Sequence, residues 1–249
     1  MEPQELDELS AGAALHTLIG LLLSTLAGAF LAILVLPHWV PALVGSLQGP
    51  HPKAYWYLAR ASGLVAYAFL WFSMILGLTI TSRIARLWPG GPTAFNLHQH
   101  TALLSLALSL FHALILLGDR YISFTLWQIF LPFASVNYRP FSVGLGQLGF
   151  YLLALVWLTF YVRRWIGHVM WRQIHYLSFG VFILVTVHGL LSGTDGDKAG
   201  VRIMYQVAGA SVFALSIYRV LATRVRQFLR RWLPVLGMER SGWGWRSRG

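Results

Sequence analysis

Residues 171–189, WRQIHYLSFGVFILVTVHG, form an apolar run that carries His175 near one end and His188 near the other. A second apolar run, LHQHTALLSLALSLFH, carries His98 and His112 in the same way. An imidazole ring inside a membrane is costly unless it has a partner. Two histidine pairs on two separate apolar segments therefore predict a group that is buried between the segments and bound by both.

The composition indicates the solvent in which the chain folds. Of its 249 residues, 57% are hydrophobic and only 11% are charged. The apolar windows are also longer than a soluble domain of this size needs. We therefore predict an all-α integral membrane protein with several spans, in which little length remains for an additional soluble domain.

The absence of cysteine limits the cofactors that this protein can hold. With no cysteine in the sequence, disulfides, thiolate metal sites, cysteine-ligated iron–sulfur clusters and the C-x-x-C-H attachment of c-type haem are all excluded. Haem is the candidate that paired histidines favour. It would have to be held non-covalently, as a b-type haem.

Apolar windows and turn signals divide the chain into six predicted spans. The first span is expected to end at Pro37, because proline interrupts a helix. The acidic residues before it are unlike the basic start of a secretory signal, so we expect this segment to be retained. The predicted spans are 13–36, 56–81, 97–117, 143–162, 172–191 and 201–221.

Three regions follow from these spans. Residues 1–12 are predicted to be a cytoplasmic N-terminal segment, and residues 13–222 the membrane domain. Residues 223–249 are predicted to be a basic cytoplasmic tail that begins with an amphipathic stretch lying on an anionic leaflet.

The distribution of positive charge predicts the topology. Thirteen Lys and Arg residues lie on the side of the two termini, and six lie on the other side. By the positive-inside rule both termini are cytoplasmic. The net charge of +11 then reflects topology and lipid binding, which makes nucleic acid a poor partner. His98 and His175 are expected at the cytoplasmic depth of the membrane, and His112 and His188 at the outer depth.

The spacing of the two histidines within one segment predicts a shared helix face for His98 and His112, but not for His175 and His188. Fourteen residues separate His98 from His112, which corresponds to about 3.9 helical turns and about 21 Å, so both project from nearly the same face. Thirteen residues separate His175 from His188, or about 3.6 turns, which requires either a local π or 3₁₀ adjustment or haems attached at different azimuths. His100 points to another face than His98.

Several other residues have a structural and a functional interpretation. Arg60 lies in the first turns of its span, where it either reaches the headgroups or neutralises a haem propionate. His168 is predicted to be solvated in a basic loop. The segment 118–140 is expected to lie partly in the membrane interface, with Trp127, Phe130 and Phe133 toward the apolar side, and to roof the site near His112.

Two short motifs are rejected as ligand sites. Residues 144–149, GLGQLG, match a dinucleotide fingerprint, but the strand, the amphipathic helix and the acidic residue that this fingerprint requires are missing. Asp195 and Asp197 are too few for a calcium loop and are interpreted as a polar turn.

The stretches WRQIHYLSF, PFASVNYRP and YLARASGLVAY resemble bacterial members of the ferric reductase-like transmembrane domain family. The family includes ferric reductases, NADPH oxidases and the haem subunit of the bacterial methionine sulfoxide reductase system. The resemblance covers about residues 55–222. It implies a six-helix bundle enclosing two stacked b-type haems, each held by one histidine from the third helix and one from the fifth.

Carried onto this sequence, the resemblance assigns a role to each histidine. His98 and His175 would hold the inner haem, and His112 and His188 the outer haem. The family's spacings of fourteen and thirteen are those found here, and Arg60 sits where NADPH oxidases place an arginine beside the outer haem. The sequence also departs from the oxidases, because they carry a further histidine on the third helix where this chain has Leu116.

The resemblance implies a function and its partners. The chain would be the haem-binding subunit of an oxidoreductase system in the bacterial inner membrane, carrying electrons to an extracytoplasmic acceptor. Since no FAD or NAD(P) domain follows, the donor would be a separate cytoplasmic flavoprotein. Two alternatives stay open: a histidine-lined transition-metal permease, and a structural membrane protein that merely tolerates its histidines.

Overall fold

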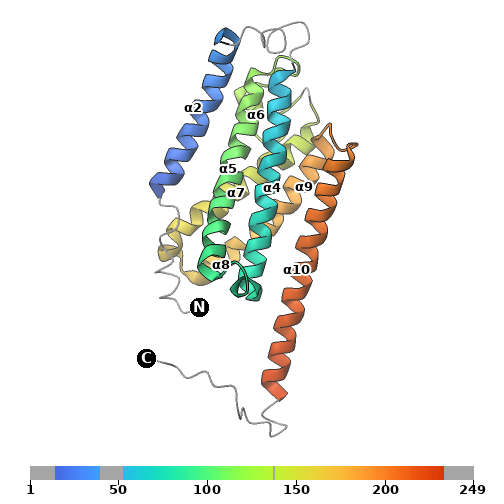
Figure 1. The fold of residues 1–249 in the computed structure, drawn as a ribbon. Coiled ribbons are helices and arrows are strands. Elements are labelled where there is room, and N and C mark those ends of the chain that lie inside the picture. The colour runs from blue at the N-terminus through green and yellow to red at the C-terminus, as the bar shows by residue number, and fades with distance from the viewer. Residues whose placement is uncertain (1–14, 40–52, 137, 233–249) are drawn as a thin grey trace.

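The computed structural model describes residues 15–39, 53–136 and 138–232, and all the regular structure in these ranges is helical (Figure 1). Six helices or helix pairs are long and apolar enough to cross a membrane, which indicates a multi-pass membrane protein. The helices are α2 (Leu15–Trp39), α4 (Ala54–Ser82), α5 (Gly91–Ile115), α6 (Leu126–Phe130), α7 (Pro140–Ile166), α8 (His168–His175), α9 (Leu177–Ser192) and α10 (Ala199–Trp232).

The spans pack as neighbours in an up-and-down bundle. Helix α4 packs along most of α5, and α7 packs along α9, while α2 covers α5 and α10 covers α4 (Figure 1). In Figure 1 the C-terminal part of α10 lies below the bundle, and α6 lies toward the upper end. These two ends are called the lower and the upper end below.

An aromatic core joins α4, α9 and α10 at the middle of the bundle. The Tyr67 ring is stacked on Phe182, with ring centroids 5.8 Å apart, and lies 4.7 Å from Tyr205. The Tyr67 hydroxyl is 3.0 Å from the hydroxyl of Thr186 on α9. This buried cluster fixes the distance between α4 and the helices that face it.

The prediction that the first span ends at Pro37 is wrong, because α2 continues through this proline to Trp39. A proline within a helix leaves the carbonyl four residues earlier without its usual N–H donor. That carbonyl belongs to Ile33, and it accepts a hydrogen bond of 3.2 Å from the hydroxyl of Tyr55 on α4. A donor from another helix therefore compensates for the missing bond.

The C-terminal boundary of the membrane domain also differs from the prediction. Helix α10 runs without interruption from Ala199 to Trp232, so the predicted border between residues 222 and 223 falls inside it. The basic stretch continues the axis of the span below the bundle and does not turn to lie along a membrane surface (Figure 1). The predicted N-terminal segment 1–12 and the rest of the tail lie outside the described residues.

Candidate functional site: two histidine pairs

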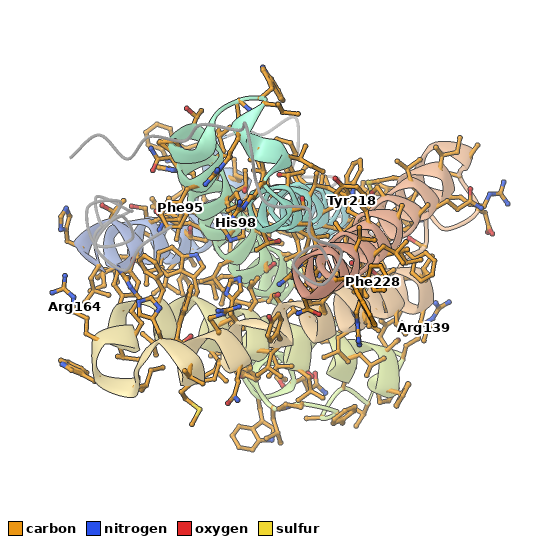
Figure 2. The ribbon with its side chains drawn as sticks, turned by 90° about the horizontal axis from the view of Figure 1, so that it is seen from below. Phe95, His98, Arg139, Arg164, Tyr218 and Phe228 are labelled. Atoms are coloured by element: carbon orange, nitrogen blue, oxygen red, sulfur yellow. The ribbon has the colours of Figure 1, made fainter. Side chains whose placement is uncertain are left out.

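The structure brings the four histidines together in two pairs at different depths of the bundle. His98 on α5 faces His175 at the end of α8, with ring centroids 6.1 Å apart. His112 on α5 faces His188 on α9, with ring centroids 6.2 Å apart. Viewed from the lower end, His98 lies in the interior of the bundle, whereas Arg164 lies at its edge (Figure 2).

The centroid separations match the geometry of two imidazoles that share one metal ion. A metal on the line between two ring nitrogens, about 2.0–2.1 Å from each, places the centroids about 6.3 Å apart, because each nitrogen is about 1.1 Å from its own centroid. The ring planes are inclined to each other by 70° in the first pair and by 77° in the second. Both pairs therefore have the dimensions of a bis-histidine site.

A break in the fifth span makes the thirteen-residue spacing workable. Tyr176 separates α8 from α9, and its N–H is 3.2 Å from the carbonyls of both Arg172 and Gln173. The bond to the Gln173 carbonyl spans three residues and closes a 3₁₀ turn. The local adjustment predicted from the histidine spacing is confirmed, and it lies directly after His175.

Three of the four rings are held by a backbone carbonyl on the neighbouring helix. In each case the ring Nδ1 lies within hydrogen-bond distance of that carbonyl. Because a carbonyl oxygen only accepts, Nδ1 must carry the proton, and in the neutral ring Nε2 keeps its lone pair for a ligand. The bonds are His98 to Ser73 at 2.9 Å, His112 to Ala59 at 2.6 Å and His188 to Ser142 at 2.7 Å.

A glycine lies against each of these three rings. A Cβ at the glycine would come within 2.9 Å of His112 at Gly63, 3.3 Å of His98 at Gly77 and 2.6 Å of His188 at Gly146. In every case the glycine follows the accepting residue by four positions, one helical turn later. The missing side chain gives the ring room to approach the helix and reach the carbonyl.

The glycines repeat the spacing of the histidines that they face. Gly63 and Gly77 on α4 are fourteen residues apart, as are His98 and His112 on the antiparallel α5. Sequence reasoning missed this match, although the equal spacing was visible. Gly146 belongs to the rejected nucleotide motif 144–149, but in the structure it lies against the ring of His188 in the outer pair.

His175 is positioned differently from the other three histidines. No described residue makes a hydrogen bond to its ring. The ring lies instead against Trp171, one turn earlier on α8, with centroids 5.4 Å apart and planes tilted by 33°. Packing against an indole therefore takes the place of the carbonyl bond at this ligand position.

A large cavity opens beside the outer pair. The centre of a water molecule can move through about 200 Å³ of it, and His112 and His188 both line it. Gln128, Ile129 and Phe130 of α6 also border this cavity, which agrees with the prediction that the segment 118–140 roofs the site near His112. Trp127 and Phe133 are exposed in the structure.

Two residues anchor α6 over this cavity. Gln147 of α7 donates from its side-chain amide to the carbonyls of Gln128 and Ile129, at 2.7 Å each. The Thr125 hydroxyl accepts a hydrogen bond from the Gln128 N–H at 3.3 Å. The Gln128 side chain in turn accepts one from the Thr125 backbone N–H, which completes a capping box. The short helix is therefore held from two sides.

Arg60 borders the same cavity and is paired with a carboxylate. Its Nε donates to Asp195 at 2.6 Å, and its terminal nitrogen contacts the other carboxylate oxygen. Lys198 adds a second cation 2.7 Å from Asp195. The predicted role of Arg60 toward a haem propionate stays a prediction, and Asp195 is a partner that the sequence did not reveal.

The remaining histidines lie apart from both pairs. His100 is exposed and bonds through Nδ1 to the Asn96 carbonyl on its own helix at 2.8 Å. His168 is exposed as predicted, but it is the first residue of α8 and not part of a loop. Among the described residues, no group of three or more His, Cys, Asp or Glu side chains is arranged to hold a metal ion.

No protein-family model, no curated protein and no solved structure matches the chain.

Proposed function

We propose that this chain carries electrons across a membrane through two b-type haems, one held by His98 and His175 and the other by His112 and His188. Haem supplies reversible one-electron chemistry at its iron when it is bound. The residues of the chain provide the axial nitrogens, set the depth of each site and exclude water. The resemblance of the sequence to the ferric reductase-like domain motivated this proposal and stays a prediction.

The observation that carries the proposal is the tautomer imposed on three of the rings. A separation near 6 Å also occurs between aromatic rings in direct edge-to-face contact, so the distance alone does not decide between the two arrangements. The carbonyl bonds of His98, His112 and His188 support the site shared by a ligand, because in the neutral ring they leave Nε2 without a proton. Such a bond on the far nitrogen is the usual support of a metal-binding histidine.

The number of ligands also favours haem over a bare metal ion. Two imidazoles leave most coordination positions of a transition metal unfilled, and no third His, Cys, Asp or Glu is arranged to join either pair among the described residues. A porphyrin supplies the equatorial nitrogens itself. The alternative of a transition-metal permease, which needs several protein ligands along a path, has weaker support.

The charge of the bundle ends suggests where the donor binds. Arg83 and Arg86 follow α4, Arg164 lies near the end of α7, and Arg172 lies in α8, so these arginines belong to the end of the bundle that carries His98 and His175. In the proposed topology this end faces the cytoplasm. An acidic flavoprotein would be steered to this end, where His98 and His175 would hold the haem nearer to it. His112 and His188 would hold the second haem nearer to an electron acceptor on the other side.

Haem content in matched single variants tests the proposal. A pyridine haemochrome assay and a reduced-minus-oxidised spectrum of the purified protein should give about two b-type haems per chain, and His98→Ala or His188→Ala should leave about one. His100→Ala and His168→Ala are controls on the same helical segments and should retain both haems. Added imidazole should restore haem to the alanine variants, because it fills the space left by the ring.

Two results would overturn the proposal. One is the absence of haem from folded protein made with ample haem supply. The other is an unchanged haem content in both His98→Ala and His188→Ala. In either case transport of divalent metals would become the assay of choice.

A further inference from the structure

A second cavity lies at the lower end, between α4, the start of α9 and α10. The centre of a water molecule can move through about 580 Å³ of it. Tyr176, which follows the ligand candidate His175, forms part of its wall. The lining divides into an apolar part, made by Leu78, Phe179 and Val220, and a polar part that includes Arg219 and Arg224.

The two arginines of this cavity are available to an anion. Arg219 is oriented by Tyr176, since its guanidinium lies 5.8 Å from the Tyr176 ring centroid and its terminal nitrogen is 3.4 Å from the hydroxyl. Arg224 is exposed, and no described residue forms an ion pair with it. The hydroxyls of Ser216 and Thr223 donate to their own helix, so the guanidinium groups are the strongest open donors.

No carboxylate of the described chain lies near these arginines. The described acidic residues are Asp119, Asp195 and Asp197, and all three follow helices that end at the upper end of the bundle. The positive charge of the cavity is therefore not neutralised by the described protein. The counter-ion of this cavity therefore comes from outside the described residues.

The depth of the cavity indicates which kind of anion fits. The candidate membrane span of α10 ends at Val225, so Arg219 and Arg224 lie in its last two turns, where an arginine can reach the headgroups. Above them α10 exposes Phe213, Ile217 and Val220, a surface suited to lipid chains. A soluble phosphate would leave the apolar wall of the cavity uncovered.

We infer that this cavity binds an anionic phospholipid, with its phosphate held by Arg219 and Arg224 and an acyl chain along Leu78, Phe179 and Val220. Arginine forks match the oxygens of a phosphate, and basic pockets between membrane helices are typical sites of anionic headgroups. The inference does not depend on haem. It places a lipid contact beside Tyr176 and hence beside one histidine pair.

Lipid retention measured by native mass spectrometry tests the inference. The full chain would be purified from nanodiscs that contain phosphatidylcholine with or without phosphatidylglycerol. We expect one retained phosphatidylglycerol per chain, with about tenfold weaker binding in Arg224→Gln and near-normal binding in Arg224→Lys. Arg202→Gln, on the same helix at the upper end, and Arg164→Gln, at the lower end of α7, are controls that should bind as the unmodified chain does.

A stability measurement separates the lipid from a soluble anion. Phosphatidylglycerol should raise the melting temperature of the unmodified protein in detergent and have less effect on Arg224→Gln, while millimolar inorganic phosphate or glycerol phosphate should not substitute for it. Equal stabilisation by soluble phosphate would overturn the inference. Equal lipid binding by Arg224→Gln and the unmodified chain would do the same.

Discussion

The Nδ1 of His112 donates a hydrogen bond of 2.6 Å to the carbonyl oxygen of Ala59 on the neighbouring helix. This bond joins the side chain of α5 to the backbone of α4, and Gly63 provides the space in which the ring lies. The orientation of a proposed haem ligand therefore depends on how closely two helices approach. Substitutions on α4 should affect the site although α4 contributes no ligand.

The glycine that faces His112 should be essential for the outer site. In Gly63→Ala the added methyl group would lie 2.9 Å from Nδ1 and push the ring away from the Ala59 carbonyl. We expect the outer haem to be lost or to have about tenfold lower occupancy, with the inner haem retained. Haem content and a redox titration of the two haems measure this.

Gly180→Ala is the matched control, because nothing lies within 4 Å of a Cβ at this position on α9. It should retain both haems and keep or slightly raise the melting temperature, since alanine is the better helix former by about 1 kcal/mol. Equal haem content in Gly63→Ala and Gly180→Ala would show that the close approach is unimportant.

The ion pair between Arg60 and Asp195 should stabilise the upper end of the bundle. Both side chains are largely buried, with 21% and 12% of their surface exposed, so removal of one partner leaves a poorly solvated charge. Arg60→Gln and Asp195→Asn are each expected to cost about 1–3 kcal/mol of stability, and the double variant less than their sum. Asp197→Asn, at an exposed neighbour, is the control, and additive costs would contradict a direct pair.

Trp171 should set the orientation of His175. In Trp171→Leu the imidazole loses its flat neighbour, so we expect altered low-spin electron paramagnetic resonance signals and a shifted midpoint potential for the inner haem only. Trp171→Phe keeps an aromatic face and should restore most of both properties. If both variants had the signals of the unmodified protein, Trp171 would have no positioning role.

Asp119 should make stability depend on pH. Burial raises the pKa of its carboxyl, although the N–H of Ile122 donates to it at 2.9 Å and opposes this effect. A raised pKa means that the folded protein binds the proton more tightly, so stability is highest below the ordinary aspartate pKa and falls as the pH rises through the raised value. Asp119→Asn should therefore be more stable than the unmodified protein at neutral pH and lose this advantage in acid. Melting curves at several pH values measure the difference, and a pH-independent difference would contradict it.

Reduction by an acidic flavoprotein should depend strongly on salt. Association driven by the arginines of the lower end should slow at least tenfold between about 50 mM and about 500 mM salt, because the charges become screened. Arg164→Gln combined with Arg172→Gln should reduce this slope, whereas Arg202→Gln at the upper end should not. Stopped-flow reduction of the haem bands gives the rates, and rates independent of salt would exclude electrostatic steering.

The sequence predicted the features that depend on one segment at a time. Apolar length located the spans, and the spacing of His98, His112, His175 and His188 suggested the two pairs that the structure brings together. The features that it did not predict depend on contacts between distant segments. Asp195 is 135 residues from Arg60, and the continuation of α2 past Pro37 needs a donor from another helix.

The backbone carbonyls that orient the histidine rings are difficult to predict from a sequence. The accepting groups are carbonyls, which every residue possesses, so their positions are set by the relative placement of two helices and not by residue type. Only the glycines leave a trace in the sequence, in the fourteen-residue spacing of Gly63 and Gly77. That trace is informative once α4 is known to be antiparallel to α5.

The carbonyl bonds have an evolutionary consequence. Ala59, Ser73 and Ser142 accept through their peptide groups, so mutations that exchange their side chains for others of similar size would preserve the bonds to the histidines. Exchange is best tolerated at Ala59, because the Ser73 hydroxyl lies 3.0 Å from the His98 Nδ1 and the Ser142 hydroxyl accepts a hydrogen bond from Ser192. The glycines one turn later are constrained by the rings that they face. Proteins that share this architecture could exchange side chains along α4 and still orient the rings of His98 and His112.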